Sequence, residues 1–473
     1  MLTNQSSGPA IPINLISEND FEDWVGQHTS VTRAWLSAQG FRGERNKLVT
    51  VPNSQGQLAS VVYGLGQRVA NEGLNIWHGA ALPERLPEGT YQLITAASAA
   101  DAAQFALGWE YGQYRFDRYK KDDKKITERG QRGLSKVLLI DQVDLSEAQN
   151  INQACSLARD LINTPASDLT PQALAQTAED IAKRFNATVR RYVGEQLLSA
   201  GFPAVHAVGR AGAIAPELVD FEWGDVANPR VTLVGKGVCF DSGGLDIKPS
   251  AAMLLMKKDM GGAACVLALA QLIMQAQLPV RLRVIIPAVE NAIAGNAFRP
   301  GDVLATRAGF SVEVGNTDAE GRLILCDALA LADVDAPELL IDMATLTGAA
   351  RVALGPEIPA LFTRDATLAR ALMDVGTQAT DPMWQLPLWP GYDDELSSKI
   401  ADLNNISTSG FAGSITAGLF LQRFVSKAKQ WVHLDLYAWN SKDRPGRPVG
   451  AEAQCVRALY AYLKARFALP VGR

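Results

Sequence analysis

The sequence predicts an α/β fold, with a smaller N-terminal α/β domain and a larger α/β domain. The larger domain is expected to hold a mostly parallel central sheet covered by helices on both faces. From residue 166 onward, strand-like apolar runs alternate with helical patterns. Those runs are nearly continuous, as in strands that are buried on both faces. A helical pattern lies before them, so we expect domains at 1–145 and 166–473 joined by a linking helix at 146–165.

The composition is that of an ordinary soluble globular protein, with 473 residues, 47% hydrophobic and 20% charged. A net charge of −5 gives no electrostatic support for binding nucleic acid or an anionic membrane. The apolar runs are too short to span a bilayer, and the first twenty residues lack the order of a signal peptide. The five scattered cysteines fit free thiols in a reducing compartment, so we expect a cytoplasmic protein. Four histidines make a histidine-rich zinc site unexpected.

In the first domain, the patterns predict two helices and four strands. An Asn-Ser-Gln-Gly turn separates the first two of these strands. A charged run from Tyr114 to Lys125 is expected to be a solvated loop. We find no catalytic constellation here, so packing or oligomer contact is the expected role of this domain. In chain order, the predicted elements are helix Phe21–Ala38, strands Lys47–Val51, Leu58–Tyr63 and Tyr91–Ile94, helix Ala99–Tyr111 and strand Val137–Ile140.

The second part begins with a predicted helix, Ser146–Asn163, that ends before a Thr-Pro pair. Thr170 and Pro171 are expected to cap the next helix, Gln172–Phe185. In sheets of this kind, functional sites form beyond the carboxyl ends of the strands. The predicted strands are Thr188–Tyr192, Ala204–Val208, Val231–Val234, Arg283–Ala288, Leu339–Met343 and Trp431–Leu436.

The octet Asn316–Leu323 carries two carboxylates, Asp318 and Glu320, directly before a predicted helix. Carboxylates two residues apart in an extended segment point the same way, so both can reach one ion. Gly321 permits a close backbone approach. Taken alone, the octet also fits a loop whose acids favour the positive end of the helix dipole.

A second polar cluster lies upstream, where the strand Val231–Val234 leads into a glycine-rich segment with Lys236, Asp241 and Lys248. The segment lacks the G-x-x-x-x-G-K-[ST] pattern, so phosphate binding is a weak interpretation. Asp259 precedes an apolar helix at a position where it would also serve as an N-cap.

Four acids converging on one sheet edge would repel each other unless cations lay between them. Oxygen ligands with few histidines suit manganese, magnesium or zinc, and bridging carboxylates suit a two-metal site that activates water. The residues alone therefore predict a two-metal hydrolase without naming its substrate. By contrast, Asp246 and Asp327 are expected to be caps or surface acids, and His433 a hydrogen-bonded core residue.

These segments resemble the signature of the leucyl aminopeptidase family of two-metal exopeptidases. The octet matches the family hallmark without a change, and the resemblance covers roughly residues 150–450. The first domain is similar more loosely, mainly at Tyr114–Lys120. The other matching segments are Val234–Ser250, Met256–Ala263, Asn163–Pro165, Pro300–Val303, Asp342–Ala349, Gly413–Ala417 and Trp431–Asp435.

The resemblance implies a metal-dependent aminopeptidase whose ligands to two divalent ions are Lys236, Asp241, Asp259, Asp318 and Glu320. In such an enzyme, one ion is held more tightly, by this set without Asp318. The other is held by Asp241, Asp318 and Glu320. Manganese or zinc is expected, with magnesium as a further alternative.

The resemblance also implies two catalytic residues. Lys248 would stabilise the oxyanion that develops on the scissile carbonyl. Arg322 would position a bicarbonate that acts as general base.

By the same resemblance, Met256, Thr345 and Gly348 contribute to the pocket for the N-terminal side chain. Two further pocket positions, small and methionine in well-studied relatives, are Tyr437 and Asn440 here. We therefore expect weaker selection for leucine than the family name implies, with small or polar residues relatively favoured.

The family implies small peptide substrates and a homohexamer. Two alternatives remain open at this point. One is a two-metal hydrolase of another ester or amide, such as a phosphoesterase. The other is a non-enzymatic or DNA-binding role, which the intact motifs and the acidic net charge disfavour.

Overall fold

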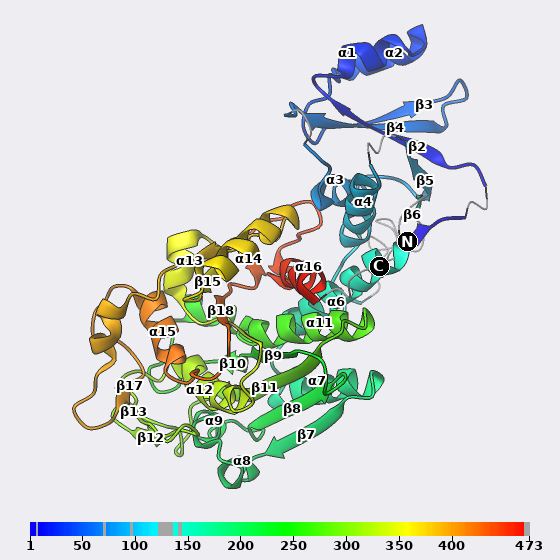
Figure 1. The fold of residues 1–473 in the computed structure, drawn as a ribbon. Coiled ribbons are helices and arrows are strands. Elements are labelled where there is room, and N and C mark those ends of the chain that lie inside the picture. The colour runs from blue at the N-terminus through cyan, green and yellow to red at the C-terminus, as the bar shows by residue number, and fades with distance from the viewer. Residues whose placement is uncertain (6–7, 70–71, 95–97, 122–135, 141–143, 468–473) are drawn as a thin grey trace. The chain divides into compact units, whose positions relative to one another are not determined.

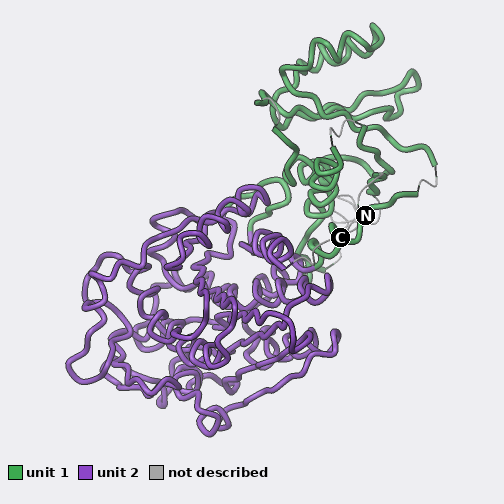
Figure 2. The backbone as a smooth tube through the Cα atoms, viewed as in Figure 1, with its two compact units in different colours: residues 1–153, 442–449 green, residues 154–441, 450–473 purple. Residues whose placement is uncertain are grey.

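The protein is described by a computed structural model that covers residues 1–5, 8–69, 72–94, 98–121, 136–140 and 144–467. The chain forms a smaller and a larger compact unit (Figure 2). The smaller unit contains residues 1–153 and 442–449, and the larger one contains residues 154–441 and 450–473. Both are α/β units, as the sequence predicts. These units are defined by which residues pack together. The predicted domain limits at 145 and 166 therefore stay a prediction.

The smaller unit is built on a six-stranded sheet with the order β1-β6-β5-β2-β4-β3 (Figure 1). All neighbouring pairs are parallel except β3 and β4, which form an antiparallel hairpin. The strands are β1 Leu2–Thr3, β2 Ile11–Ser17, β3 Leu48–Pro52, β4 Leu58–Gly66, β5 Gly89–Leu93 and β6 Lys136–Leu139. The helices include α1 Phe21–Gly26, α2 Ser30–Ala38, α3 Ile76–Ala80 and α4 Ala99–Tyr111.

Two expectations for this unit are wrong. The single helix predicted over 21–38 is two helices, because Thr29 is extended and its hydroxyl accepts a hydrogen bond from the Thr32 N–H, which starts α2 anew. The central strand β2 was not predicted, because Pro12 and Asn14 interrupt the run of apolar residues that is typical of a buried strand. Part of the charged run, 122–125, lies outside the described residues.

The larger unit is built on a nine-stranded sheet with the order β16-β15-β18-β14-β9-β11-β8-β7, and β10 pairs with β11. Strands β18, β14, β9 and β11 run parallel in its centre, and antiparallel pairings lie toward both edges. The strands are β7 Thr188–Val193, β8 Glu217–Trp223, β9 Arg230–Gly235, β10 Gly237–Asp241, β11 Arg281–Asn291, β14 Leu339–Ala344, β15 Ala360–Phe362, β16 Trp384–Gln385 and β18 Trp431–Asp435.

Helices cover both faces of this sheet (Figure 1). Helices α7 Pro171–Arg184, α11 Gly261–Gln275 and α16 Val456–Phe467 lie on one face. Helices α9 Pro203–Gly209, α12 Glu320–Asp333 and α15 Gly413–Gln422 lie on the other. The remaining elements are α6 Leu145–Asn163, α8 Gln196–Ser199, α10 Ser250–Met253, η1 Met256–Lys258, α13 Gly348–Leu354, α14 Ala366–Gln378, η2 Pro390–Leu396, and the short strands β12 Val303–Ala305, β13 Ser311–Glu313, β17 Leu403–Asn404, β19 Trp439–Asn440 and β20 Gly450–Ala451.

The strand predicted over 204–208 is wrong, because these residues belong to helix α9. Pro203 starts the helix, and Asp327 caps it from a distant part of the chain. The Asp327 carboxylate accepts hydrogen bonds from the Ala204 N–H at 2.9 Å and the Val205 N–H at 3.2 Å. Asp327 is thus a cap, as expected, although it is fully buried, and this burial raises its pKa to about 7. Strand β8 was also missed.

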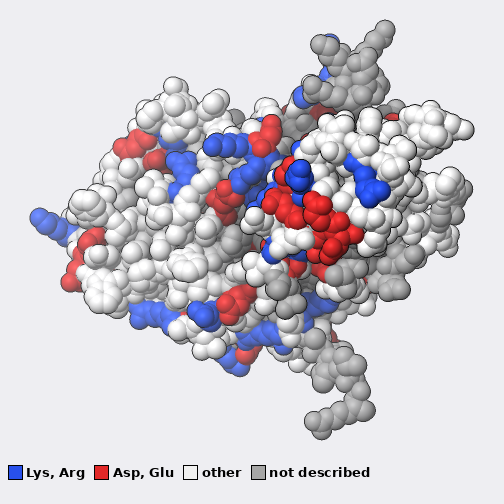
Figure 3. Space-filling model, turned by 90° about the horizontal axis from the view of Figure 1, so that it is seen from above, with Lys and Arg blue, Asp and Glu red and all other residues white. Residues whose placement is uncertain are grey.

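Charged side chains of both signs lie on the face of the molecule shown in Figure 3. On the face shown in Figure 3, lysine and arginine are interspersed with aspartate and glutamate, and acidic side chains gather in one group. Among the helices of the described residues, none is long and apolar enough to cross a membrane.

His433 is a core residue in β18, as the sequence predicts. Its Nδ1 lies 2.5 Å from a carboxylate oxygen of Asp342 on the neighbouring strand β14. The indole N–H of Trp431 donates to the other oxygen at 2.8 Å, and Phe362 stacks on the imidazole with ring centroids 5.7 Å apart. The pair therefore joins two strands in the centre of the sheet.

The His433–Asp342 pair predicts a pH-dependent stability. Burial alone would lower the pKa of His433, but the Asp342 carboxylate outweighs it and raises the pKa above its ordinary value. The stabilisation is therefore complete below the unfolded pKa of about 6.5 and is lost as pH rises through the higher folded value. Urea unfolding of the larger unit should show a loss of stability from pH 6 to pH 9 that is smaller in His433→Gln. An equal loss in both proteins would contradict the ion pair.

Candidate metal centre

The polar residues singled out in the sequence meet at the carboxyl edge of the parallel strands. Lys236 follows β9, Asp241 ends β10 and Thr345 follows β14. Asp259 lies two residues before α11, and Glu320 is the first residue of α12. Asp259 does not cap α11, because no side-chain cap bond is made there and its carboxylate points into the cluster. The architecture thus brings together groups that are 84 residues apart between Lys236 and Glu320.

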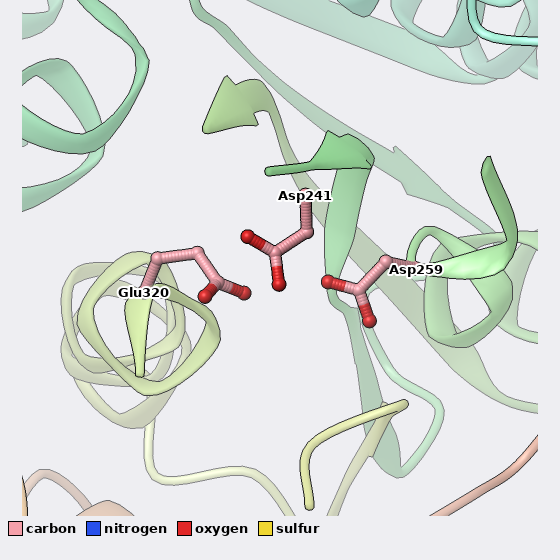
Figure 4. Close-up of side chains that lie close together, drawn as sticks. All are labelled: Asp241, Asp259 and Glu320. Carbon is pink, nitrogen blue, oxygen red and sulfur yellow. The ribbon is translucent and has the colours of Figure 1, made fainter. Parts of the chain in front are cut away.

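Three buried carboxylates, Asp241, Asp259 and Glu320, form the centre of the site (Figure 4). One oxygen of each lies within 4.8 Å of the others, an arrangement that can hold a metal ion. Three like charges at this distance in a buried place repel each other strongly. Burial and the neighbouring Asp241 accordingly raise the pKa of Glu320 well above its ordinary value.

Lys236 supplies positive charge to this group. Its Nζ lies 2.7 Å from an oxygen of Asp259, 3.0 Å from an oxygen of Glu320 and 2.9 Å from the Thr345 carbonyl, to which it donates. Burial alone would lower the pKa of the amine, but the surrounding carboxylates raise it above its ordinary value. Gly321 makes the approach possible, because a Cβ there would lie 2.5 Å from Cε of Lys236.

Lys248 contacts the outer part of the cluster. Its Nζ lies 2.7 Å from Asp241 and also pairs with Asp318. Burial would lower its pKa, but the two acids raise it. The side chain of Asp318 is 36% exposed, whereas Glu320 is buried. The extended geometry predicted for these two acids is wrong, since Asp318 lies in a turn and Glu320 starts a helix.

Several polar side chains orient the carboxylates, and one of them, Asn291, is not among the residues predicted from the sequence. The Asn291 amide donates to Asp241 at 2.8 Å and to the Thr317 carbonyl at 3.1 Å. The Thr345 hydroxyl donates to Asp259 at 2.8 Å. Asp246, expected to be a cap or surface acid, accepts from the Thr317 N–H at 2.7 Å and so fixes the turn before Asp318. Amides and hydroxyls carry no pattern by which a sequence could identify such partners.

Arg322 is the third residue of α12, within its first turn, and is buried. Its guanidinium donates to the Asn405 carbonyl at 2.7 Å. Burial lowers its pKa to about 10, while Glu320 and Asp435 oppose this effect. Within the described part of the chain, the Arg322 Nε–H has no hydrogen-bond acceptor. The side chain therefore has donor capacity that its own protein surroundings do not use.

Unsatisfied buried oxygens indicate that the carboxylates suit a cation. Among the described residues, Glu320 Oε2 is buried without a hydrogen-bond donor. Asp259 Oδ2 has Lys236 at ion-pair distance, but the geometry is not that of a hydrogen bond. Buried carboxylate oxygens without donors are rare and fit metal coordination. The oxygen-rich set, with one amine, suits a hard or borderline divalent ion.

Of the predicted pocket residues, Thr345 contacts the carboxylate group directly. Thr345 is buried against Asp259, Met256 is half-buried in η1, and Gly348 starts α13 with open space where a Cβ would point. Tyr437 is half-buried beyond β18. Asn440 instead turns its amide to buried Glu452, at 2.7 Å, which meets its need for a polar partner.

Buried acids and lysines at the carboxyl edge of a parallel sheet define a metal-dependent hydrolase of the α/β class. The catalytic-domain model of the cytosol aminopeptidase family matches residues 156–460, and the model of the M17 aminopeptidase N-terminal domain matches residues 11–129. The chain belongs to this family of metal-dependent aminopeptidases. The predicted resemblance, fold class and enzyme class are thereby confirmed.

Individual relatives agree with this assignment. A probable cytosol aminopeptidase of Geobacter sp. strain M21 is 41% identical over 373 residues, which are 76% of this chain and 74% of the relative. The cytosol aminopeptidase of Coxiella burnetii superposes with a TM-score of 0.92 at 44% identity and covers 98% of this chain and 99% of its own. The bottromycin maturation enzyme BotP, solved in complex with Mn, has a TM-score of 0.86 at 32% identity, with 97% and 99% covered.

The close approach of α12 to Lys236 predicts that Gly321→Ala misplaces the amine. The added Cβ would clash with Cε and Nζ of Lys236, at 2.5 Å and 2.7 Å, so the amine must move away from Glu320. Overpacking of this kind typically costs about 1–3 kcal/mol of stability. Thermal unfolding without metal should show this loss, and manganese affinity should fall as well. Gly295→Ala is the control, since its Cβ enters open space. Unchanged stability and affinity in Gly321→Ala would contradict the packing.

Proposed function

We propose that this aminopeptidase removes the N-terminal residue from small peptides by a two-metal mechanism. The observation that carries the proposal is the group of buried carboxylates Asp241, Asp259 and Glu320, which two lysines border at ion-pair distance. Two divalent ions bound there would activate a water molecule and hold the substrate amine.

The five proposed ligands would divide into two sets that share Asp241 and Glu320. Lys236 and Asp259 complete the inner set, and Asp318 completes the outer set. The greater exposure of Asp318 supports easier exchange of the outer ion. Manganese or zinc suits the ligands, with magnesium as a further alternative. A lysine ligates metal only as the neutral amine, so loading the inner set would release the proton that Lys236 holds beside the carboxylates.

Lys248 and Arg322 are the proposed catalytic residues. Lys248 pairs with Asp241 and Asp318, and with divalent ions held by those acids its ammonium would be free to donate to the oxyanion of the substrate. Arg322 has a buried Nε–H without an acceptor among the described residues, which suits a small anion such as bicarbonate as general base. No histidine lies in either motif to serve as the base instead.

The assembly and setting of the enzyme are proposed from its family. We propose a homohexamer in the cytoplasm, in keeping with relatives that are named cytosol aminopeptidases. Met256, Thr345 and Gly348 would border the pocket for the N-terminal side chain, with Tyr437 reducing its volume. A phosphoesterase remains the alternative hydrolase, and DNA binding has no support in the net charge of −5.

The two-metal proposal predicts that Asp241→Ala loses both ions, because Asp241 belongs to both ligand sets. With manganese, the wild-type protein should hydrolyse leucyl and alanyl amides and leave phosphoesters intact. After dialysis, metal analysis should find two ions per wild-type chain and few in the variant, whose amide hydrolysis should be lost.

Asp374→Ala is the matched control, since Asp374 is an exposed residue of α14. It should keep both ions and full activity. Two ions retained in Asp241→Ala with near-normal turnover would refute the shared ligand. Phosphoester cleavage without amide cleavage would refute the proposed function.

The role of Arg322 is tested separately. Arg322→Ala should lower kcat by about 10²–10⁴-fold, the usual contribution of general-base catalysis, while metal content stays unchanged. In carbonate-free buffer, added bicarbonate should activate the wild-type protein more than the variant. An equal response of the two proteins would show that Arg322 does not position the base.

A further inference from the structure

Two cations flank the aromatic ring of Tyr437. The Lys258 Nζ lies 4.7 Å from the ring centroid, and the Arg351 guanidinium carbon lies 4.8 Å from it. Lys258 comes from η1 and is only 5% exposed, whereas Arg351 comes from α13 and is exposed. Three separate elements therefore place positive charge around one ring.

Among the described residues, no ion pair or side-chain hydrogen bond is made by Lys258 or Arg351. Asp259 and Asp435 are the acids whose charge acts on the pKa of Lys258. Both have other partners, since Asp259 binds Lys236 and Asp435 accepts from backbone N–H groups after β14. The Tyr437 ring offsets part of the desolvation cost of the buried Lys258 ammonium. A carboxylate bound beside it would offset more of that cost.

These cations border the proposed pocket. Lys258 is two residues from Met256 in the same short helix, and Arg351 is three residues from Gly348 in α13. Residues three apart on a helix share a face, so Arg351 and Gly348 lie on the same face of α13. Tyr437, which the cations flank, is a position at which this chain departs from the small residue of the family pattern.

We propose that this pocket selects N-terminal residues with an acidic side chain, glutamyl or aspartyl, whose carboxylate pairs with Arg351 and Lys258. The inference rests on the proposed aminopeptidase function and specifies its substrate class. Arg351 offers a planar, permanently charged donor set that can bind a carboxylate through two hydrogen bonds. Lys258, which is buried beside the Tyr437 ring, adds a second donor.

The test compares glutamyl and glutaminyl amides, which match in size and differ in charge. With manganese, the wild-type kcat/KM should favour the glutamyl amide by about tenfold, because hydrogen bonds to charged groups are the stronger ones. This ratio should fall toward one in Arg351→Gln, be partly kept in Arg351→Lys, and decrease with added salt. Arg370→Gln, an exposed arginine of α14, is the control and should keep the wild-type ratio.

A wild-type ratio at or below one, together with good turnover of leucyl and alanyl amides, would overturn this inference and leave the aminopeptidase intact. A glutamyl preference that persists unchanged in Arg351→Gln would also overturn it. If free dipeptides outperform their amides and the difference is lost in Arg351→Gln, the cations bind the peptide carboxyl terminus instead, and the inference fails. No turnover of any amide would overturn the proposed function and this inference with it.

Discussion

The larger unit depends on one constraint, which is that several buried carboxylates must remain close together at a single sheet edge. Asp241, Asp259 and Glu320 lie within 4.8 Å of each other in a place that water reaches poorly. Such an arrangement is stable only with cations between or beside the acids. Lys236 and Lys248 provide two of them, yet burial and the neighbouring Asp241 still hold the pKa of Glu320 well above its ordinary value, so an electrostatic cost remains. Divalent ions would relieve it further, and this links stability to catalysis.

The fold satisfies this constraint through close backbone packing. Parallel strands end at one edge and deliver Lys236 and Asp241, while two helices begin there and deliver Asp259 and Glu320. The helices can approach because each has glycine in its first turn, Gly261 and Gly262 in α11 and Gly321 in α12. A Cβ at Gly262 would lie 2.0 Å from the Met343 carbonyl oxygen, on the strand beneath α11. The glycines that allow the helices to pack closely therefore also fix the positions of the carboxylates.

The α/β class and the meeting of the acids at one sheet edge could be predicted from the sequence, because both depend on local patterns. The octet around Asp318 and the apolar runs of the central strands are examples. Features that depend on distant partners were not predictable. Helix α9 looked like a strand because its cap, Asp327, lies more than a hundred residues away. The cations beside Tyr437 likewise became visible only when η1, α13 and the end of β18 came together.

We propose that two divalent ions bind within the carboxylate cluster and take over the positive charge that Lys236 and Lys248 supply there. A crystal soaked in manganese and measured at the manganese absorption edge tests it most directly. The account predicts two anomalous peaks per chain, with Asp241 and Glu320 bound to both ions, the Lys236 amine bound to one, and Lys248 released from Asp318. A single peak, or two peaks with Lys236 still paired to Asp259 and Glu320, would contradict the account.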